Sequence, residues 1–303
     1  MIRPNRRRFL TIAAGALGAA ALPAQAAPLH RWRGISMGAQ ATILIAHPDA
    51  QAITARAEAE IARLEGVFSL FRPESALSRL NAAGRLDAPP FELLECLALA
   101  GQVHRASGGL FDPTIQPLWA LYAESHAAGR APSGDEIAAA RARTGWHRLR
   151  FDSAAVTMDP GMALTLNGIA QGLVADRVAD LLRAEGLDDI LIDTGEMRAL
   201  GGHPEGGGWP VALQGGGAVS LRDRALATSA PLGTVFDAGG RVGHILHPQT
   251  GRPDAGPWQR VSISAPRAAL ADALSTAACL MARPEAVVDL VAAFDGARIE
   301  ALA

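Results

Sequence analysis

Short strand-like runs and longer helical segments follow one another in this chain without strict strand–helix alternation. Of all the sequence features, this irregular order most limits the fold classes that the chain can adopt. Helical periodicity covers residues 50–64, 91–107 and 169–184, while strand-like runs cover residues 42–46 and 189–192. A parallel α/β fold would need regularly repeated strand–helix units. We therefore predict an α+β fold, built as two intimate subdomains of mixed or antiparallel sheet with packed helices.

Three further segments carry start or stop signals. Residues 68–73 are interpreted as a strand that ends at Pro73. Residues 131–143 are predicted to form a helix with Ser133 as its N-cap. Residues 163–166 are interpreted as a strand that leads directly into the helix beginning near residue 169.

The first 26 residues have the pattern of an export signal. They carry four arginines, then a short apolar stretch, and end on the small-residue sequence AQA. The run NRRRFL at 5–10 favours a twin-arginine signal, with an ordinary Sec signal as the alternative. We expect residues 1–26 to be removed and residues 27–303 to form one periplasmic domain. No cysteine follows the cleavage site, so no lipid anchor is expected.

The composition excludes several kinds of chemistry. All 28 basic residues are arginine, so the chain can form neither a lysine Schiff base nor a P-loop that ends in Lys-Ser or Lys-Thr. The formal net charge of −2 gives no basic field for nucleic acid. No interior run of eighteen or more apolar residues follows the signal, so we do not expect the processed chain to span a membrane.

The two cysteines, Cys96 and Cys279, both lie in apolar, helix-like surroundings. Buried free thiols are the favoured interpretation, and an exported protein could instead join them in one disulfide. Neither has a nearby Cys or His that would complete a soft-metal site.

Asp272 and Thr276 lie four residues apart on the last long predicted helix, so both project from one face, with Ser275 beside them. A carboxylate and a hydroxyl are hard oxygen ligands, which suit a Mg²⁺ ion that takes its remaining ligands from water and phosphate. The alternative is a solvated helix face or a local hydrogen bond.

Residues 167–172, NGIAQG, place a helix N-terminus with small side chains directly after a strand-like run. Free backbone N–H groups at such a terminus favour an anion such as a pyrophosphate. A tight turn that needs Gly168 is the alternative. The mature chain has no G-x-G-x-x-G sequence, which disfavours a Rossmann dinucleotide site.

Two histidines, His244 and His247, lie at a predicted strand end. Zinc is disfavoured because no third ligand stands at a usual spacing. A histidine that contacts phosphate or acts as acid or base is one interpretation, and a structural histidine is the other. Asp112 is expected to cap a turn, while Asp193 and Glu196 could face a cleft or merely cap.

Taken together, these segments resemble the FAD:protein FMN transferase family, the ApbE family, and in particular its twin-arginine-exported, NosX-like members. The resemblance covers nearly the whole mature chain in order. Its pieces are GISMGA (34–39), SLFRP (69–73), LSRLN (77–81), LFDPT (110–114), LNGIAQG (166–172), DTGE (193–196), HILHPQTG (244–251) and ADALSTA (271–277).

The resemblance implies an ApbE-like domain over residues 27–303, with FAD in a cleft between the subdomains. The cofactor-binding residues that it implies are Met37, Phe71, Asn81, Leu110, Phe111, Asp112, Thr165, Gln171, His244 and Leu246. The metal-binding residues that it implies for Mg²⁺ are Gly168, through a backbone carbonyl, and Asp272, Ser275 and Thr276. The catalytic residues on this basis are His244 and Asp272.

The implied reaction is phosphoryl transfer. A Thr or Ser hydroxyl of a partner protein attacks the FMN phosphorus of FAD, AMP leaves, and Mg²⁺ offsets the developing charge. The implied partner is a flavin-accepting protein of a membrane-bound or periplasmic electron-transfer system. An FAD carrier without catalysis and an FAD pyrophosphatase, which would use water in place of the protein hydroxyl, are the alternatives.

The chain also departs from the family pattern. Gln171 stands where the family has lysine, Thr165 where an acid is common, and His247 where the family has aspartate. Gln171 can donate a hydrogen bond to phosphate but brings no charge, and losing a charged hydrogen bond costs about 1–3 kcal/mol of binding. These departures bear on rate and substrate tolerance, while the Asp272 and Thr276 pair is intact.

Overall fold

The computed structural model describes residues 28–213, 215–253 and 256–303; the predicted signal peptide, residues 1–26, lies outside these described residues. Within them the centre is one seven-stranded sheet, in which every neighbouring pair is antiparallel. In spatial order the strands are β1 (His30–Ser36), β2 (Ala39–Ile45), β6 (Ile190–Asp193), β7 (Met197–Leu200), β10 (Ala225–Ser229), β11 (Val261–Ala265) and β12 (Arg298–Leu302).

Alternate side chains of the sheet serve two separate apolar cores. Ile43 and Ile45 of β2 face a layer of helices, while Leu44 between them faces the other side with Trp209, as the two-residue period of a strand requires. The other side is covered in part by a ribbon of β8 (Trp209–Ala212) and β9 (Ala218–Leu221). The helical layer packs on the main core and contains α1 (Ala50–Phe68), α3 (Phe91–Ala106), α6 (Ala170–Ala184), α7 (Ala268–Ala278) and α8 (Pro284–Ala292).

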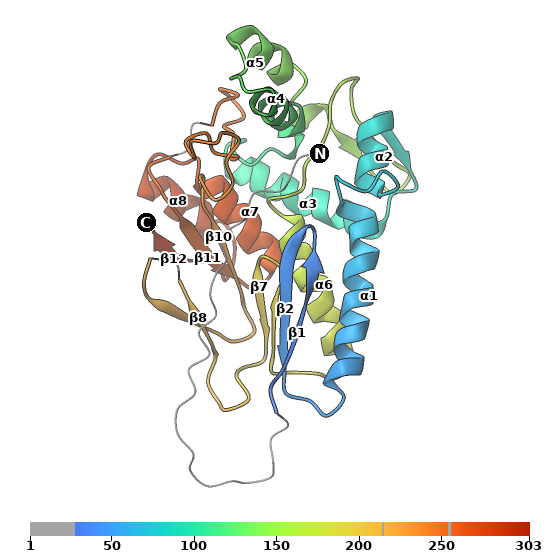
Figure 1. Ribbon diagram of the computed structural model, residues 1–303, viewed down its shortest axis with the longest axis vertical. Coiled ribbons are helices and arrows are strands. Elements are labelled where there is room, and N and C mark those ends of the chain that lie inside the picture. Colours follow the sequence, from blue (N-terminus) through green and yellow to red (C-terminus); the bar gives the residue numbers. More distant parts are fainter. Residues whose placement is uncertain (1–27, 214, 254–255) are drawn as a thin grey trace.

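A smaller group of elements lies at one end of the sheet (Figure 1). It contains α2 (Ala76–Ala83), a small sheet of β3 (Arg85–Asp87), β5 (Ala155–Thr157) and β4 (Arg150–Phe151), and the helices α4 (Gln116–Ala127) and α5 (Gly134–Arg141). Leu118, Tyr122 and Ile137 form a small core of their own, whereas Leu86 and Val156 join the main core. The predicted α+β fold with antiparallel sheets is confirmed.

The predicted helices at residues 50–64, 91–107 and 169–184 are confirmed as α1, α3 and α6. α5 begins directly after Ser133, as its N-cap role predicts. The Ser133 hydroxyl accepts a hydrogen bond from the Glu136 N–H at 3.2 Å, and the Glu136 carboxylate accepts one from the Ser133 N–H at 2.8 Å. This reciprocal pair is a capping box.

The strands predicted at residues 68–73 and 163–166 are wrong. α1 continues to Phe68, and the chain that follows is fixed by the Ser75 and Ser78 hydroxyls, which donate hydrogen bonds to the Ser69 carbonyl. Residues 163–166 form no strand either, because the Asn81 side chain and the Pro113 carbonyl, and not a neighbouring strand, hold their backbone. An apolar run shows that a segment is buried but not whether a partner strand lies beside it.

Cys96 and Cys279 are buried free thiols, as predicted. Burial raises the pKa of Cys279 to about 12, and it raises the pKa of Cys96 well above its usual range. Among the described residues, no helix combines the length and apolar character needed to cross a membrane.

Candidate functional site

A cleft of about 780 Å³ opens where the sheet, the helical layer and the smaller group of elements meet. Segments far apart in sequence supply its walls: β1 and β2, the loop before α4, the N-terminus of α6, the turn after β6, the end of β10, the loop around His244, and α7. The predicted site residues that line it are Leu110, Phe111, Asp112, Thr165, Gly168, Gln171, His244, Leu246, Asp272 and Thr276.

α7 brings its carboxylate and hydroxyl to one wall of the cleft. Asp272 is only 3% exposed and lines the cleft together with Thr276 one turn later. Ser275 is fully buried beside them. Its hydroxyl donates a hydrogen bond to the Asp272 carbonyl at 3.0 Å and lies 2.7 Å from the Ser229 hydroxyl. Ser275 therefore braces α7, and its part in a metal site stays a prediction.

The N-terminus of α6 lies directly against these α7 residues. A Cβ added to Gly168 would be 3.0 Å from the Thr276 hydroxyl oxygen, so the backbone at Gly168 borders Thr276. The Gly172 N–H donates a long hydrogen bond of 3.4 Å to Asp272 Oδ2. The Asp272 carboxylate and the Thr276 hydroxyl of α7 thus lie against the backbone at the start of α6, about 100 residues away in sequence.

This donor set fits a hard divalent cation better than zinc. In the described part of the chain, no three His, Cys, Asp or Glu side chains gather as a metal-binding group. One carboxylate with a hydroxyl and a carbonyl is an incomplete oxygen shell, which suits Mg²⁺ because this ion keeps waters and takes substrate phosphate oxygens. The residues present are compatible with the predicted Mg²⁺ site.

Asp176 of α6, which the sequence did not single out, positions α7. Its fully buried carboxylate accepts hydrogen bonds from the N–H groups of Ala268 and Ala269, the first residues of α7, at 2.8 and 3.0 Å. It also forms ion pairs with Arg198 at 3.3 Å and Arg267 at 3.2 Å. Burial raises the pKa of Asp176, and the Arg267 charge opposes that rise. An acid inside the apolar stripe of a predicted helix was the available signal.

His244 and His247 occupy different environments and do not form a joint site. His244 lines the cleft, and its Nδ1 lies 3.0 Å from the Thr234 carbonyl oxygen. Because a carbonyl only accepts, Nδ1 carries the proton, and Nε2 is the basic nitrogen of the neutral ring. His247 is not among the residues that line the cleft, and its Nδ1 accepts a hydrogen bond from the Gln249 N–H in a turn.

Asp112 caps a short 3₁₀ turn, as predicted for this residue type. Its carboxylate accepts hydrogen bonds from the Thr114 N–H at 2.9 Å and the Thr114 hydroxyl at 2.7 Å. Phe111, just before it, is buried, and its ring edge approaches Gly168. The cap therefore fixes the loop wall of the cleft against the α6 terminus.

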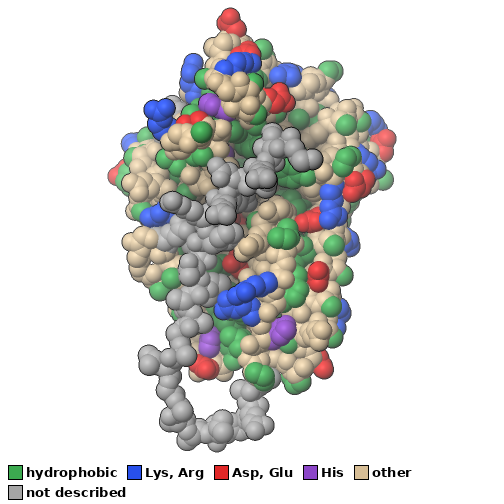
Figure 2. Space-filling model, viewed as in Figure 1, with side chains coloured by type: hydrophobic (Ala, Val, Ile, Leu, Met, Phe, Trp, Pro, Cys, Tyr) green, Lys and Arg blue, Asp and Glu red, His purple; other side chains and the backbone are tan. Residues whose placement is uncertain are grey.

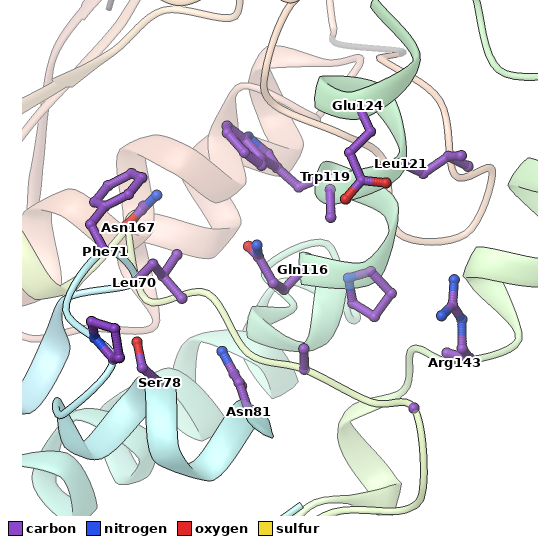
Figure 3. A pocket seen from close by; sticks show the side chains of 15 residues that line it. Leu70, Phe71, Ser78, Asn81, Gln116, Trp119, Leu121, Glu124, Arg143 and Asn167 are labelled. Atoms are coloured by element: carbon purple, nitrogen blue, oxygen red, sulfur yellow. The ribbon is translucent and has the colours of Figure 1, made fainter. Parts of the chain in front are cut away.

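A second hollow of about 640 Å³ adjoins the cleft, because Trp119 and Asn167 line both. Figure 3 shows Phe71 and Asn81 on its walls. Phe71 is 81% exposed. The Asn81 amide is engaged with the backbone of Leu164, since it donates to the carbonyl at 2.8 Å and accepts from the N–H at 2.7 Å.

Met37 lines neither the cleft nor the second hollow. It lies in the turn between β1 and β2 with a positive φ of 49°. Its N–H donates a hydrogen bond of 2.9 Å to Glu65 Oε1, and its side chain packs against the main core. Its part in cofactor binding stays a prediction.

Gln171 contacts the turn after β6. Its Nε2 is buried and has no hydrogen-bond partner among the residues that the structure describes. A Cβ added to Gly195 would lie 2.9 Å from that nitrogen, and Gly195 has a positive φ of 104°. Asp193 and Glu196 of the same turn line the cleft, and burial raises the pKa of Asp193. An unused donor at this place is available to a bound ligand.

Three arginines that the sequence did not suggest also line the cleft: Arg31, Arg33 and Arg260. The first two alternate with Trp32 along β1, and that alternation was the signal that could have placed them on one face.

Residues 37–302 match the ApbE family. A curated relative from Treponema pallidum (strain Nichols), named FAD:protein FMN transferase, is 31% identical over 282 residues, which cover 79% of this chain and 76% of that protein. A Chlamydia pneumoniae protein of the same name is 29% identical over 228 residues and covers 71% of each chain.

Solved structures agree with these sequence matches. The Pseudomonas stutzeri flavinyl transferase ApbE, in its apo form, is similar with a TM-score of 0.80 and 26% identity, covering 92% of this chain and 96% of that one. The ApbE protein from Thermotoga maritima gives a TM-score of 0.79 at 25% identity, covering 89% and 93% of the two chains.

Proposed function

The chain belongs to the ApbE family, and on that premise we propose that it transfers FMN from FAD to a Thr or Ser hydroxyl of a partner protein, with release of AMP. The observation that carries this proposal is that the backbone at the start of α6 lies against α7, Gly168 against Thr276 and Gly172 against Asp272, at one wall of a cleft large enough for a dinucleotide. A phosphate-binding helix terminus and a hard-cation donor pair thereby share one place.

Asp272, Thr276 and the carbonyl at Gly168 would hold Mg²⁺. Ser275 would support them through the hydrogen bond that its hydroxyl donates to the Asp272 carbonyl. When bound, this ion supplies positive charge that stabilises the negative charge developing on the phosphate oxygens. Asp272 is nearly fully buried, so its carboxylate is preorganised and loses little freedom on binding.

The transfer step exchanges one phosphorus–oxygen bond for another. The acceptor hydroxyl oxygen attacks the FMN phosphorus, the anhydride bond to the AMP phosphate breaks, and the hydroxyl proton passes to a base. His244 is suited to assist, because its Nδ1 is anchored on the Thr234 carbonyl and its Nε2 is therefore the basic nitrogen. The Gln171 amide would donate a hydrogen bond to the phosphates or the adenosine.

FAD would extend from the cleft into the second hollow, which explains why the predicted flavin residues divide between them. Leu110, Phe111, Asp112 and Leu246 line the cleft, while Phe71 lies at the hollow with most of its ring exposed. An exposed aromatic face at a ligand hollow is suited to stack on a planar ring. Asn81 would act there through the Leu164 backbone, which it holds.

The proposal includes export by the twin-arginine route to the periplasm, where the acceptor would belong to an electron-transfer system as in NosX-like members. Its support is the sequence of residues 1–26, with its arginine run and small-residue cleavage site.

The test uses purified residues 27–303 with FAD and Mg²⁺, and measures AMP release and covalent flavin on an acceptor protein. AMP and adduct should form together, and Asp272→Ala should lower both by at least about a hundredfold. Asp289→Ala, an exposed acid on α8, is the matched control and should leave both unchanged. AMP without adduct would indicate an FAD pyrophosphatase, and FAD binding without AMP would indicate a carrier.

A further inference from the structure

β1 has two chemically different faces. Trp32 packs against the main core and lies across Gly34, where an added Cβ would come within 2.3 Å of the indole ring. Arg31, Arg33 and Ile35 alternate with these residues and therefore project from the opposite face. All three are exposed, and Ile35 is 61% exposed although it is a large apolar residue.

This exposed face of β1 belongs to the wall of the cleft. Arg31, Arg33 and Ile35 line the same cleft as Asp272 and Thr276. β1 is also an edge strand, because it pairs with β2 on one side and with no described strand on the other. Figure 2 shows basic side chains near the middle of the molecular face that carries β1 and β2.

The two arginines are not neutralised by the described residues. Neither Arg31 nor Arg33 forms an ion pair or a side-chain hydrogen bond there, whereas Arg56 and Arg130, for example, pair with Glu185 and Glu136. They lie two residues apart on one face of a strand, so their Cα atoms are about 7 Å apart. That spacing matches alternate side chains of a second extended chain laid along β1.

The chemistry of the cleft requires a polypeptide to reach it. For the proposed transfer, a protein hydroxyl must approach a phosphate held near Gly168 and α7 inside this cleft. An open strand edge offers backbone hydrogen bonds to such a segment. Uncompensated arginines on the same strand select acidic side chains, and Ile35 offers an apolar contact beside them.

We propose that the acceptor protein presents an extended acidic segment that lies along β1, with carboxylates facing Arg31 and Arg33 and with its apolar atoms against Ile35, so that the modified hydroxyl enters the cleft. The inference rests on the proposed transferase function and adds to it the chemistry of the partner's docking segment.

The experiment uses residues 27–303 saturated with FAD and measures binding of fluorescent threonine peptides by anisotropy. One peptide carries Asp at alternate positions, and a second carries Asn at the same positions. The Asp peptide should bind roughly tenfold more tightly. The Arg31→Glu/Arg33→Glu variant should lose this preference, while its FAD affinity, read from flavin fluorescence, should stay unchanged.

Arg298→Glu is the matched control, because Arg298 is an exposed arginine on β12, the opposite edge strand of the same sheet. It should keep the preference for the Asp peptide. Equal binding of both peptides to the unaltered protein, or equal loss in the control, would overturn the proposal. A parallel loss of FAD affinity in the double variant would also overturn it and assign the arginines to the dinucleotide.

The AMP and adduct assay separates this inference from the function on which it rests. If the Asp peptide binds selectively through Arg31 and Arg33 but neither AMP nor adduct appears with any acceptor, the transferase proposal fails and the docking surface stands. If AMP and adduct form while the peptides bind equally, the docking surface fails alone.

Discussion

At Gly172 the backbones of α6 and α7 approach so closely that no side chain fits between them. An added Cβ would lie 2.4 Å from both the carbonyl carbon and the carbonyl oxygen of Ala268, and 2.5 Å from the Ala269 nitrogen. These atoms belong to backbone, so they cannot rotate away. The single missing methyl group therefore allows Asp272 to lie within reach of the Gly172 N–H.

Gly172→Ala should lower the free energy of unfolding by about 1–3 kcal/mol, because the overpacked helices must separate. Chemical denaturation measures this change. Gly66→Ala is the control, since Gly66 lies in α1 with no atom within 4 Å of an added Cβ. It should raise stability by about 0.5–1 kcal/mol, the ordinary gain in a helix. Equal effects of both substitutions would contradict the close-approach argument.

At the scale of elements, the carboxylate of Asp176 binds the N-terminus of α7 and so positions that helix. Two N-terminal N–H groups of the helix donate hydrogen bonds to that carboxylate, and the positive end of the helix dipole stabilises its negative charge. Arg198 is nearly as buried as its partner, and its burial lowers the pKa of the guanidinium. Charge balance inside the core thus depends on one residue of α6, and the orientation of Asp272 and Thr276 depends on the same residue.

Asp176→Ala should lower the free energy of unfolding by about 3–5 kcal/mol, because it leaves Arg198 buried without its partner. The double variant Asp176→Ala/Arg198→Met should recover part of this loss, since it removes the uncompensated charge. Urea denaturation of the single and double variants measures both. If the double variant loses more free energy of unfolding than Asp176→Ala and Arg198→Met lose together, the charge pair does not explain the loss.

At the scale of the whole molecule, the cleft exists only where the sheet, the helical layer and the smaller group of elements meet. Its walls come from β1 and β2, the loop before α4, the α6 terminus and α7. None of these segments forms a site alone. Binding in such a cleft should therefore be linked to the stability of the folded chain as a whole.

FAD at about 100 times its dissociation constant should stabilise the protein by about 2.7 kcal/mol, and Mg²⁺ should add a further increment only when FAD is present. Thermal unfolding with each ligand alone and with both measures this. Asp272→Ala should remove the Mg²⁺ increment and keep most of the FAD increment. An increment from Mg²⁺ that survives in Asp272→Ala would place the ion elsewhere.

Local patterns in the sequence were sufficient for part of the fold and site. Helical periodicity located α1, α3 and α6, and the four-residue spacing of Asp272 and Thr276 placed both on one wall of the cleft. The strand predicted at 68–73 is wrong, because α1 continues to Phe68 and the residues after it form an irregular turn in which Phe71 is 81% exposed.

The sequence by itself determined the family, the α+β class and the buried thiols, and it placed the predicted magnesium ligands Asp272 and Thr276 on one helix face, since these depend on composition, motifs and spacings within one or two turns. Only the tertiary structure decided that Gly168 borders Thr276, that Asp176 seats α7, and that Arg31 and Arg33 face the cleft. Each of these contacts joins segments that are distant in sequence, and their meeting is set by how the helices and sheet pack, which no local period encodes.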